Sequence, residues 1–145
     1  MVEPLRKNED ALTYADILSW TDDGRWELID GVAYDMSPAP TRRHQEISRV
    51  LFRQIDSFLA GMPCQIYYAP FDVRLPKAYE DATSASTVVQ PDLLVICDPT
   101  QLDDHGSVGA PALIIEILSP ATRNKDLRGK LHAYQQAGVP EYWVV

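Results

Sequence analysis

The chain is poor in cysteine, in long hydrophobic runs and in positive charge. Its only two cysteines, Cys64 and Cys97, lack the CxxC or Cys/His spacing of zinc and redox sites, so we expect reduced, buried thiols. No apolar run approaches the roughly 20 residues of a membrane-spanning helix, and the first residues lack the apolar stretch of a secretory signal. These absences favour a cytoplasmic protein with no membrane contact.

The net charge of −8 argues against a protein that coats nucleic acid non-specifically, because contacts to phosphate need cations. Positive charge is nevertheless concentrated in two basic islands, residues 42–53 and residues 123–130. Such islands suit localised contact with phosphate, although solvent-exposed helix faces would give the same pattern. The candidates for contact with a DNA backbone are Arg42, Arg43, His44, Arg123 and Lys125.

Hydrophobic periodicity divides the chain into helices and strands of a single domain, residues 1–145. Asp30-Gly31 predicts a tight hairpin between two short strands. Helices are expected at about 13–20, 41–60 and 126–137. Strands are expected at 25–29, 32–36, 64–68, 71–75, 88–97 and 112–118. Residues 142–145 look like a strand cut short, so we expect the last strands of the sheet to be missing and a sheet edge to be open.

Two carboxylates occupy apolar strands, where an unpaired charge is costly. Glu116 lies within Leu113-Ile-Ile-Glu-Ile-Leu118, and a partner arginine could neutralise it there. Asp92 begins the other apolar strand, so neighbouring strands would bring both carboxylates into one small volume. Two close anions repel each other, which raises one pKa or recruits a cation. Oxygen ligands of this kind favour Mg²⁺ or Mn²⁺.

An ordered series of segments is similar to the Uma family of endonucleases, within the PD-(D/E)XK nuclease superfamily. Pro91-Asp92 followed by Glu116 is a weak motif alone, whereas the ordered series is specific. The segments are Trp26-Glu-Leu-Ile-Asp-Gly31, Met36-Ser-Pro38, His44, Gln90-Pro-Asp-Leu-Leu-Val95, Glu116-Ile-Leu-Ser-Pro120, Asp126 with Lys130 and Tyr134, and Gly138-Val-Pro-Glu-Tyr-Trp143.

The resemblance implies an α/β (α+β) fold with a restriction-endonuclease-like αβββαβ core. A mixed central sheet flanked by helices, with an N-terminal helix and β-hairpin, would hold Asp92 and Glu116 on adjacent strands. The implied activity is hydrolysis of phosphodiester bonds in DNA with Mg²⁺ or Mn²⁺. The metal ligands would be Asp92, Glu116 and the backbone carbonyl of Ile117.

One catalytic position departs from the superfamily pattern. The superfamily's lysine normally stands two residues after the second acid, where this chain has Leu118. Related families place the lysine on the following helix, which makes Lys130 the candidate, with Tyr134 one turn further on the same helix face. The alternative is a solvent-facing Lys130 that pairs with Asp126, itself a possible site residue.

Three further residues are weaker candidates. Glu27 matches an acid of the family pattern and would be a third catalytic carboxylate, or else a surface residue of the hairpin. His44 would contact phosphate or a site carboxylate, or would cap or pack its helix. Gln90 precedes Pro91-Asp92 and could contact the site.

A second function class competes with catalysis. The acidic net charge and the displaced lysine also fit a catalytically weak or inactive nuclease-fold protein that acts in binding or assembly. In that case the basic islands would be buried in an oligomer contact or salt-bridged. The open sheet edge predicts a homodimer under either hypothesis.

Overall fold

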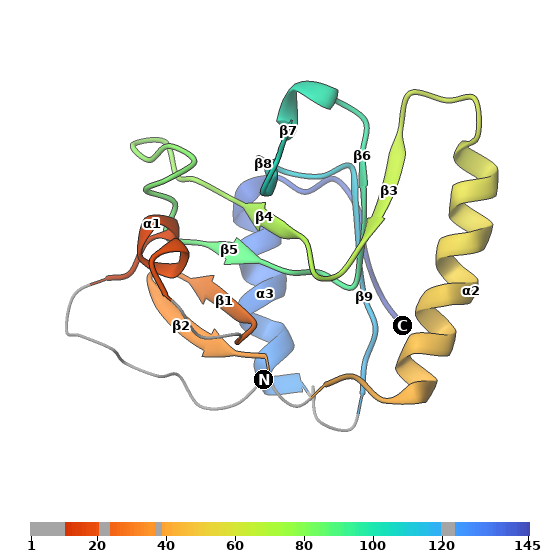
Figure 1. Ribbon diagram of the computed structural model, residues 1–145, viewed down its shortest axis with the longest axis horizontal. Helices are drawn as coiled ribbons and strands as arrows, with labels where there is room; N and C mark the ends of the chain where they lie inside the picture. The colour runs from red at the N-terminus through yellow and green to blue at the C-terminus, as the bar shows by residue number, and fades with distance from the viewer. Residues whose placement is uncertain (1–10, 21–23, 37–38, 120–123) are drawn as a thin grey trace.

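The computed structural model describes residues 11–20, 24–36, 39–119 and 124–145, which form two mixed sheets with helices beside them (Figure 1). The helices are α1 (Tyr14–Leu18), α2 (Arg42–Leu59), the short 3-10 helix η1 (Pro99–Gln101) and α3 (Asn124–Ala137). The first sheet contains β1 (Trp26–Ile29), β2 (Val32–Asp35), β4 (Asp72–Arg74), β5 (Val88–Val89), β7 (Leu102–Asp103) and β8 (Gly106–Val108). The second sheet contains β3 (Gln65–Tyr68), β6 (Leu93–Ile96), β9 (Leu113–Glu116) and β10 (Tyr142–Val144).

The strand order is β2-β1-β5-β4-β8-β7 in the first sheet and β10-β9-β6-β3 in the second. The expected α/β (α+β) class with a β-hairpin near the N-terminus is confirmed. Asp30 and Gly31 both have positive φ angles, 49° and 79°, as the two central residues of a type I′ hairpin turn require. β6 and β9 are antiparallel neighbours, with Leu93 opposite Ile115. The strand that follows Asp92 is therefore adjacent to the strand that contains Glu116, as predicted.

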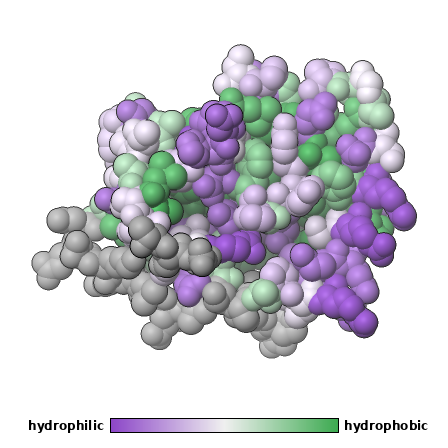
Figure 2. Space-filling model, in the orientation of Figure 1, coloured by the Kyte–Doolittle hydropathy of each residue, from purple (hydrophilic) through white to green (hydrophobic). Residues whose placement is uncertain are grey.

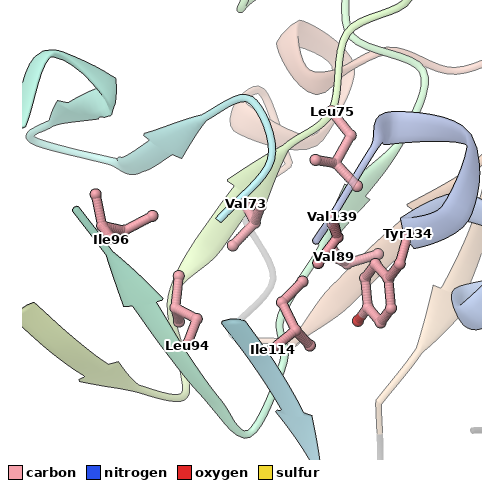
Figure 3. Packing of buried hydrophobic residues seen from close by; sticks show 8 residues of the cluster. All are labelled: Val73, Leu75, Val89, Leu94, Ile96, Ile114, Tyr134 and Val139. Atoms are coloured by element: carbon pink, nitrogen blue, oxygen red, sulfur yellow. The ribbon is translucent and has the colours of Figure 1, made fainter. Parts of the chain in front are cut away.

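Alternating side chains give the second sheet two buried faces. Leu93 and Ile115 belong to a cluster that the apolar stripe of α2 covers. Leu94 and Ile114 point the other way, toward the first sheet and Tyr134 of α3, as Figure 3 shows. Figure 1 accordingly shows α2 along the β3 side of the molecule and α3 behind the first sheet. The continuous apolar sequence of these strands reflects cover on both faces.

One predicted strand is two strands. Residues 88–97 were expected to be continuous, but β5 and β6 belong to different sheets, and Pro91 lies between them. Proline has no N–H for a ladder, and the N–H of Gln90 bonds to the Glu27 side chain instead. The single central sheet that the resemblance implied is therefore divided at the residues next to Asp92.

The prediction of reduced thiols is wrong for this structure, because Cys64 and Cys97 form a disulfide. Gln65 is opposite Ile96 in the β3–β6 pair, so the two cysteines that flank these residues face each other across the strands. Spacing along the sequence could not reveal a partner 33 residues away. Within the described part of the chain, no helix combines the length and hydrophobicity needed to span a bilayer.

Candidate active site

Lys130 lies between two carboxylates from different strands. Its Nζ is 2.8 Å from Oε2 of Glu27 on β1 and 2.7 Å from Oε1 of Glu116 on β9. All three residues are buried, with exposed fractions of 1% for Glu27, 7% for Glu116 and 5% for Lys130. The alternatives of a surface lysine and a surface hairpin glutamate are therefore wrong. We call Glu27, Glu116, Lys130 and Tyr134 the buried acid–lysine network.

Tyr134 completes this network from the next turn of α3. Its hydroxyl donates to the same oxygen of Glu116 that contacts Lys130. Burial raises the pKa of Tyr134 well above its ordinary value, and the negative charge of Glu116 adds to this effect. The predicted helical spacing of Lys130 and Tyr134 thus brings both side chains to one carboxylate.

The network contains more negative than positive charge, and the pKa shifts reflect this. Burial raises the pKa of Glu116 to about 7; Lys130 opposes the shift, while Asp92 and Glu27 add to it. Burial by itself would lower the pKa of Lys130, but the two carboxylates raise it above its usual value. Lys130 therefore remains a cation, and Glu116 can change its protonation near neutral pH.

Asp92 is held in place by two hydrogen-bonding groups. Its Oδ2 accepts the backbone N–H of Ile117 at 2.7 Å, which ties the aspartate to the residue after Glu116. Its Oδ1 is 3.0 Å from Nε2 of His44, a buried residue in the first turn of α2. The Thr41 side chain accepts the N–H of His44 and so caps this helix. Of the roles weighed for His44, contact with a site carboxylate is the one found.

Oxygen donors from Asp92 and Glu116 could hold a hard divalent cation. The charge of Asp92 adds to the rise in the pKa of Glu116, and the Asp92 carboxylate accepts the N–H of Ile117, the residue after Glu116. Both described partners of Glu116 contact Oε1, so Oε2 is the oxygen that could turn toward a cation. No group of three or more His, Cys, Asp or Glu side chains in the described segments is arranged for a metal. Two carboxylates and one carbonyl suit Mg²⁺, which keeps several waters and binds substrate phosphate.

Gln90 links the buried network to the surface. Its backbone N–H donates to Glu27 at 2.7 Å, while its side-chain oxygen accepts from Nε of Arg25 at 3.3 Å. Its side-chain amide donates to Asp72, which also accepts the Tyr14 hydroxyl. Gln90 therefore contacts the site through its backbone and orients Arg25 through its side chain.

A cleft of about 410 Å³ opens beside Asp92, and three arginines line it. Arg49 and Arg53 belong to α2, and Arg25 directly precedes β1. We call this the cationic cleft. Figure 2 shows strongly hydrophilic side chains gathered over the lower part of α2. The sequence placed Arg49 and Arg53 in a basic island, but neither was selected as a site residue, and Arg25 was missed. The spacing of Arg49 and Arg53, one helical turn apart, was the signal that could have identified them.

The other predicted cationic residues lie elsewhere. Arg42 pairs with Glu46 at 3.6 Å on an exposed part of α2, and neither it nor Arg43 lines the cleft. Arg123 lies outside the described residues. The side chains of Lys125 and Asp126 are also outside them, although both belong to α3. The side chains of Arg123 and Lys125 are therefore not placed relative to Asp92.

Comparison with known proteins agrees with this architecture. A family model named Uma2 and described as "Putative restriction endonuclease" matches residues 14–145. The chain belongs to the Uma2 family. An uncharacterized protein of Synechocystis is 27% identical over 125 residues, or 85% of this chain. The chain spans 62% of the length of that relative.

A solved structure with the same fold supports the family assignment at the level of architecture. The crystal structure of a protein described as a "putative nuclease" from Anabaena variabilis superimposes with a TM-score of 0.72 at 18% identity. The match covers 92% of this chain and 73% of the other. The chain therefore shares the fold of that protein and belongs to a family described as "Putative restriction endonuclease".

Proposed function

We propose that this protein is a metal-dependent endonuclease that hydrolyses phosphodiester bonds in DNA. The observation that carries the proposal is the position of Asp92. Its carboxylate lines the cationic cleft, and it is also tied to the strand that bears Glu116. A phosphate held by Arg49 and Arg53 would therefore lie beside the carboxylates that could hold a cation.

The donor set supports Mg²⁺ or Mn²⁺ as the cofactor, held by Asp92, Glu116 and the carbonyl of Ile117. A bound divalent ion would lower the pKa of a water and offset charge on the scissile phosphate. Lys130 supplies a fixed positive charge next to Glu116, which favours the extra negative charge of the transition state. Glu27 holds Lys130 from its other side, and His44 orients Asp92.

Nicking of supercoiled plasmid with Mg²⁺ or Mn²⁺ tests this proposal. We expect Asp92→Asn and Glu116→Gln each to lower the cleavage rate on the order of 100-fold or more. Asp56→Asn, which changes an exposed carboxylate on α2, is the matched control and should cleave normally. Cleavage by both site variants at the normal rate would contradict the proposed roles.

A folded protein that cleaves no DNA form with either metal would favour the competing function in binding or assembly. The contacts of Glu116 support this alternative, because Lys130 and Tyr134 both bind its Oε1 atom. A purely assembling protein was expected to have its basic islands buried or salt-bridged. The exposed Arg49 and Arg53 of the first island count against this alternative, whereas the buried, salt-bridged Lys130 of the second island fits it. Calorimetry with Mn²⁺ separates the two functions, because the endonuclease binds the ion and Glu116→Gln does not.

We further propose a homodimer formed along β10. This strand is at one end of the second sheet, and its residues Tyr142, Trp143 and Val144 are 38–43% exposed. Within the part of the chain that the structure describes, β10 pairs on one side only, and such an edge with apolar side chains favours pairing with a second copy. Light scattering at tens of micromolar should give twice the chain mass, and a monomer would overturn this part of the proposal.

A DNA substrate also favours a location in the cytoplasm, where glutathione keeps most thiols reduced. The Cys64–Cys97 disulfide would then form only on oxidation. Alkylation of cells before lysis should label both cysteines, and full protection from the reagent would contradict a cytoplasmic location.

A further inference from the structure

An exposed aromatic residue lines the cationic cleft together with the arginines. Tyr68, the last residue of β3, is 64% exposed although it lines the cleft. The ring of Phe52 on α2 meets it edge to face, with centroids 5.3 Å apart and planes at 81°. Phe52 thus supports the Tyr68 ring from one side and leaves much of its surface open to solvent. Contact with Phe52 alone does not explain why so large an aromatic surface stays exposed beside three arginines.

The position of Tyr68 relative to Asp92 is fixed by the backbone. Tyr68 is opposite Leu93 in the β3–β6 pair. The N–H of the next residue, Ala69, donates to the carbonyl of Asp92 at 3.1 Å. A group that stacks on Tyr68 is therefore held next to the carboxylate proposed to act on phosphate.

We propose that the cationic cleft binds an unpaired nucleotide of single-stranded DNA, with the base stacked on Tyr68 and the flanking phosphates near Arg49 and Arg53. Charge and shape both support this occupant. Three cations suit a polyanion, and a cleft of about 410 Å³ is in the size range of pockets for small ligands. A base within an intact duplex has both faces covered by its neighbours, so only an unpaired or extruded base can stack on a side chain.

This inference rests on the proposed function for its choice of DNA and adds the form of the substrate. Intact duplex could still contact the arginines through phosphate, but it could not use Tyr68. The structure therefore predicts that single-stranded DNA, or duplex with an unpaired nucleotide, binds more tightly than blunt duplex of the same sequence.

Fluorescence anisotropy in EDTA measures this binding without any cleavage. Tyr68→Ala should weaken binding to a labelled single-stranded 20-mer by roughly 10-fold, whereas its effect on blunt duplex should stay within about twofold. Tyr68→Phe retains the ring and should bind like the unmodified protein. Tyr79→Ala removes a more exposed tyrosine outside the cleft, at 83% exposure, and should have no effect.

Equal loss for single strand and duplex, or no loss for either, would overturn the inference. Tighter binding to RNA of the same sequence would overturn the choice of DNA. The result also separates this inference from the proposed function. Normal plasmid cleavage with no Tyr68 effect rejects only the inference, while a selective Tyr68 effect in a protein that never cleaves rejects only the endonuclease.

Discussion

The buried acid–lysine network and the cationic cleft place charge in opposite environments. Glu27, Glu116 and Lys130 are almost fully buried and paired with one another, whereas Arg49 and Arg53 are exposed. Asp92 belongs to both regions, because it lines the cleft and is bound to the backbone beside Glu116. The residues proposed for catalysis therefore also stabilise the fold, whereas the arginines proposed for binding can be substituted with little effect on it.

The largest expected effect is the loss of the buried cation. Lys130→Met leaves Glu27 and Glu116 buried without their partner, which should lower the free energy of unfolding by about 3–5 kcal/mol. Urea denaturation measures this change. Arg128→Met alters an exposed residue of the same helix and should stay within about 0.5 kcal/mol. Similar losses in both variants would remove the distinction between the two environments.

The disulfide should contribute stability without affecting the cleft. It closes a long loop between β3 and β6 at the ends opposite Tyr68 and Leu93. Replacing both cysteines with serine should lower the free energy of unfolding by about 2–4 kcal/mol and leave DNA affinity unchanged. A large loss of affinity would show that the cleft depends on this covalent link.

Glu116 should make the metal-free protein less stable as the pH rises. Its folded-state pKa is about 7, against an ordinary value of 4.5. Between these values the folded protein binds more protons than the unfolded chain, so the free energy of unfolding falls with rising pH. The fall should be about 3 kcal/mol, and Glu116→Gln should reduce it. Glu46→Gln is the exposed control, and an unchanged slope in Glu116→Gln would contradict the assignment.

The smallest expected effect concerns the cleft and its salt dependence. Arg49→Ala or Arg53→Ala should each reduce the slope of log affinity against log salt by about 0.7 for single-stranded DNA, with no change in unfolding. Arg42→Ala should leave the slope unchanged, because Arg42 lies outside the cleft and pairs with Glu46. If only Arg42→Ala reduced this slope, the DNA contact would belong to Arg42, as the sequence had suggested.

Local patterns predicted the elements of this fold well. Asp30-Gly31 specified the hairpin because both positions tolerate positive φ, and Gly138, with φ of 79°, follows the last residue of α3 as expected. The family resemblance implied that the strands of Asp92 and Glu116 are adjacent, and β6, which follows Asp92, does pair with β9. Pro91 was also present in the sequence, but the division of the predicted strand at residues 88–97 between two sheets was not predicted from it.

The candidate site was predicted in part. The helical spacing of Lys130 and Tyr134 pointed to one helix face, and the family resemblance selected that face for the site. The resemblance also named Glu27, but only the β1–β5 pairing and the position of α3 bring its carboxylate to Lys130. Arg25 had no local signal, because its place in the cleft depends on Gln90, a residue 65 positions away.

The sequence by itself determined which segments form helices, strands and the hairpin, because these depend on residues a few positions apart. It also specified two acids in apolar strands, which need a partner wherever they are buried. Tertiary structure alone decided that Lys130 is this partner for Glu116, that Cys64 meets Cys97, and that Tyr68 lines the same cleft as three arginines. Each of these contacts joins distant segments, and strand register and helix packing, which no local pattern encodes, bring them together.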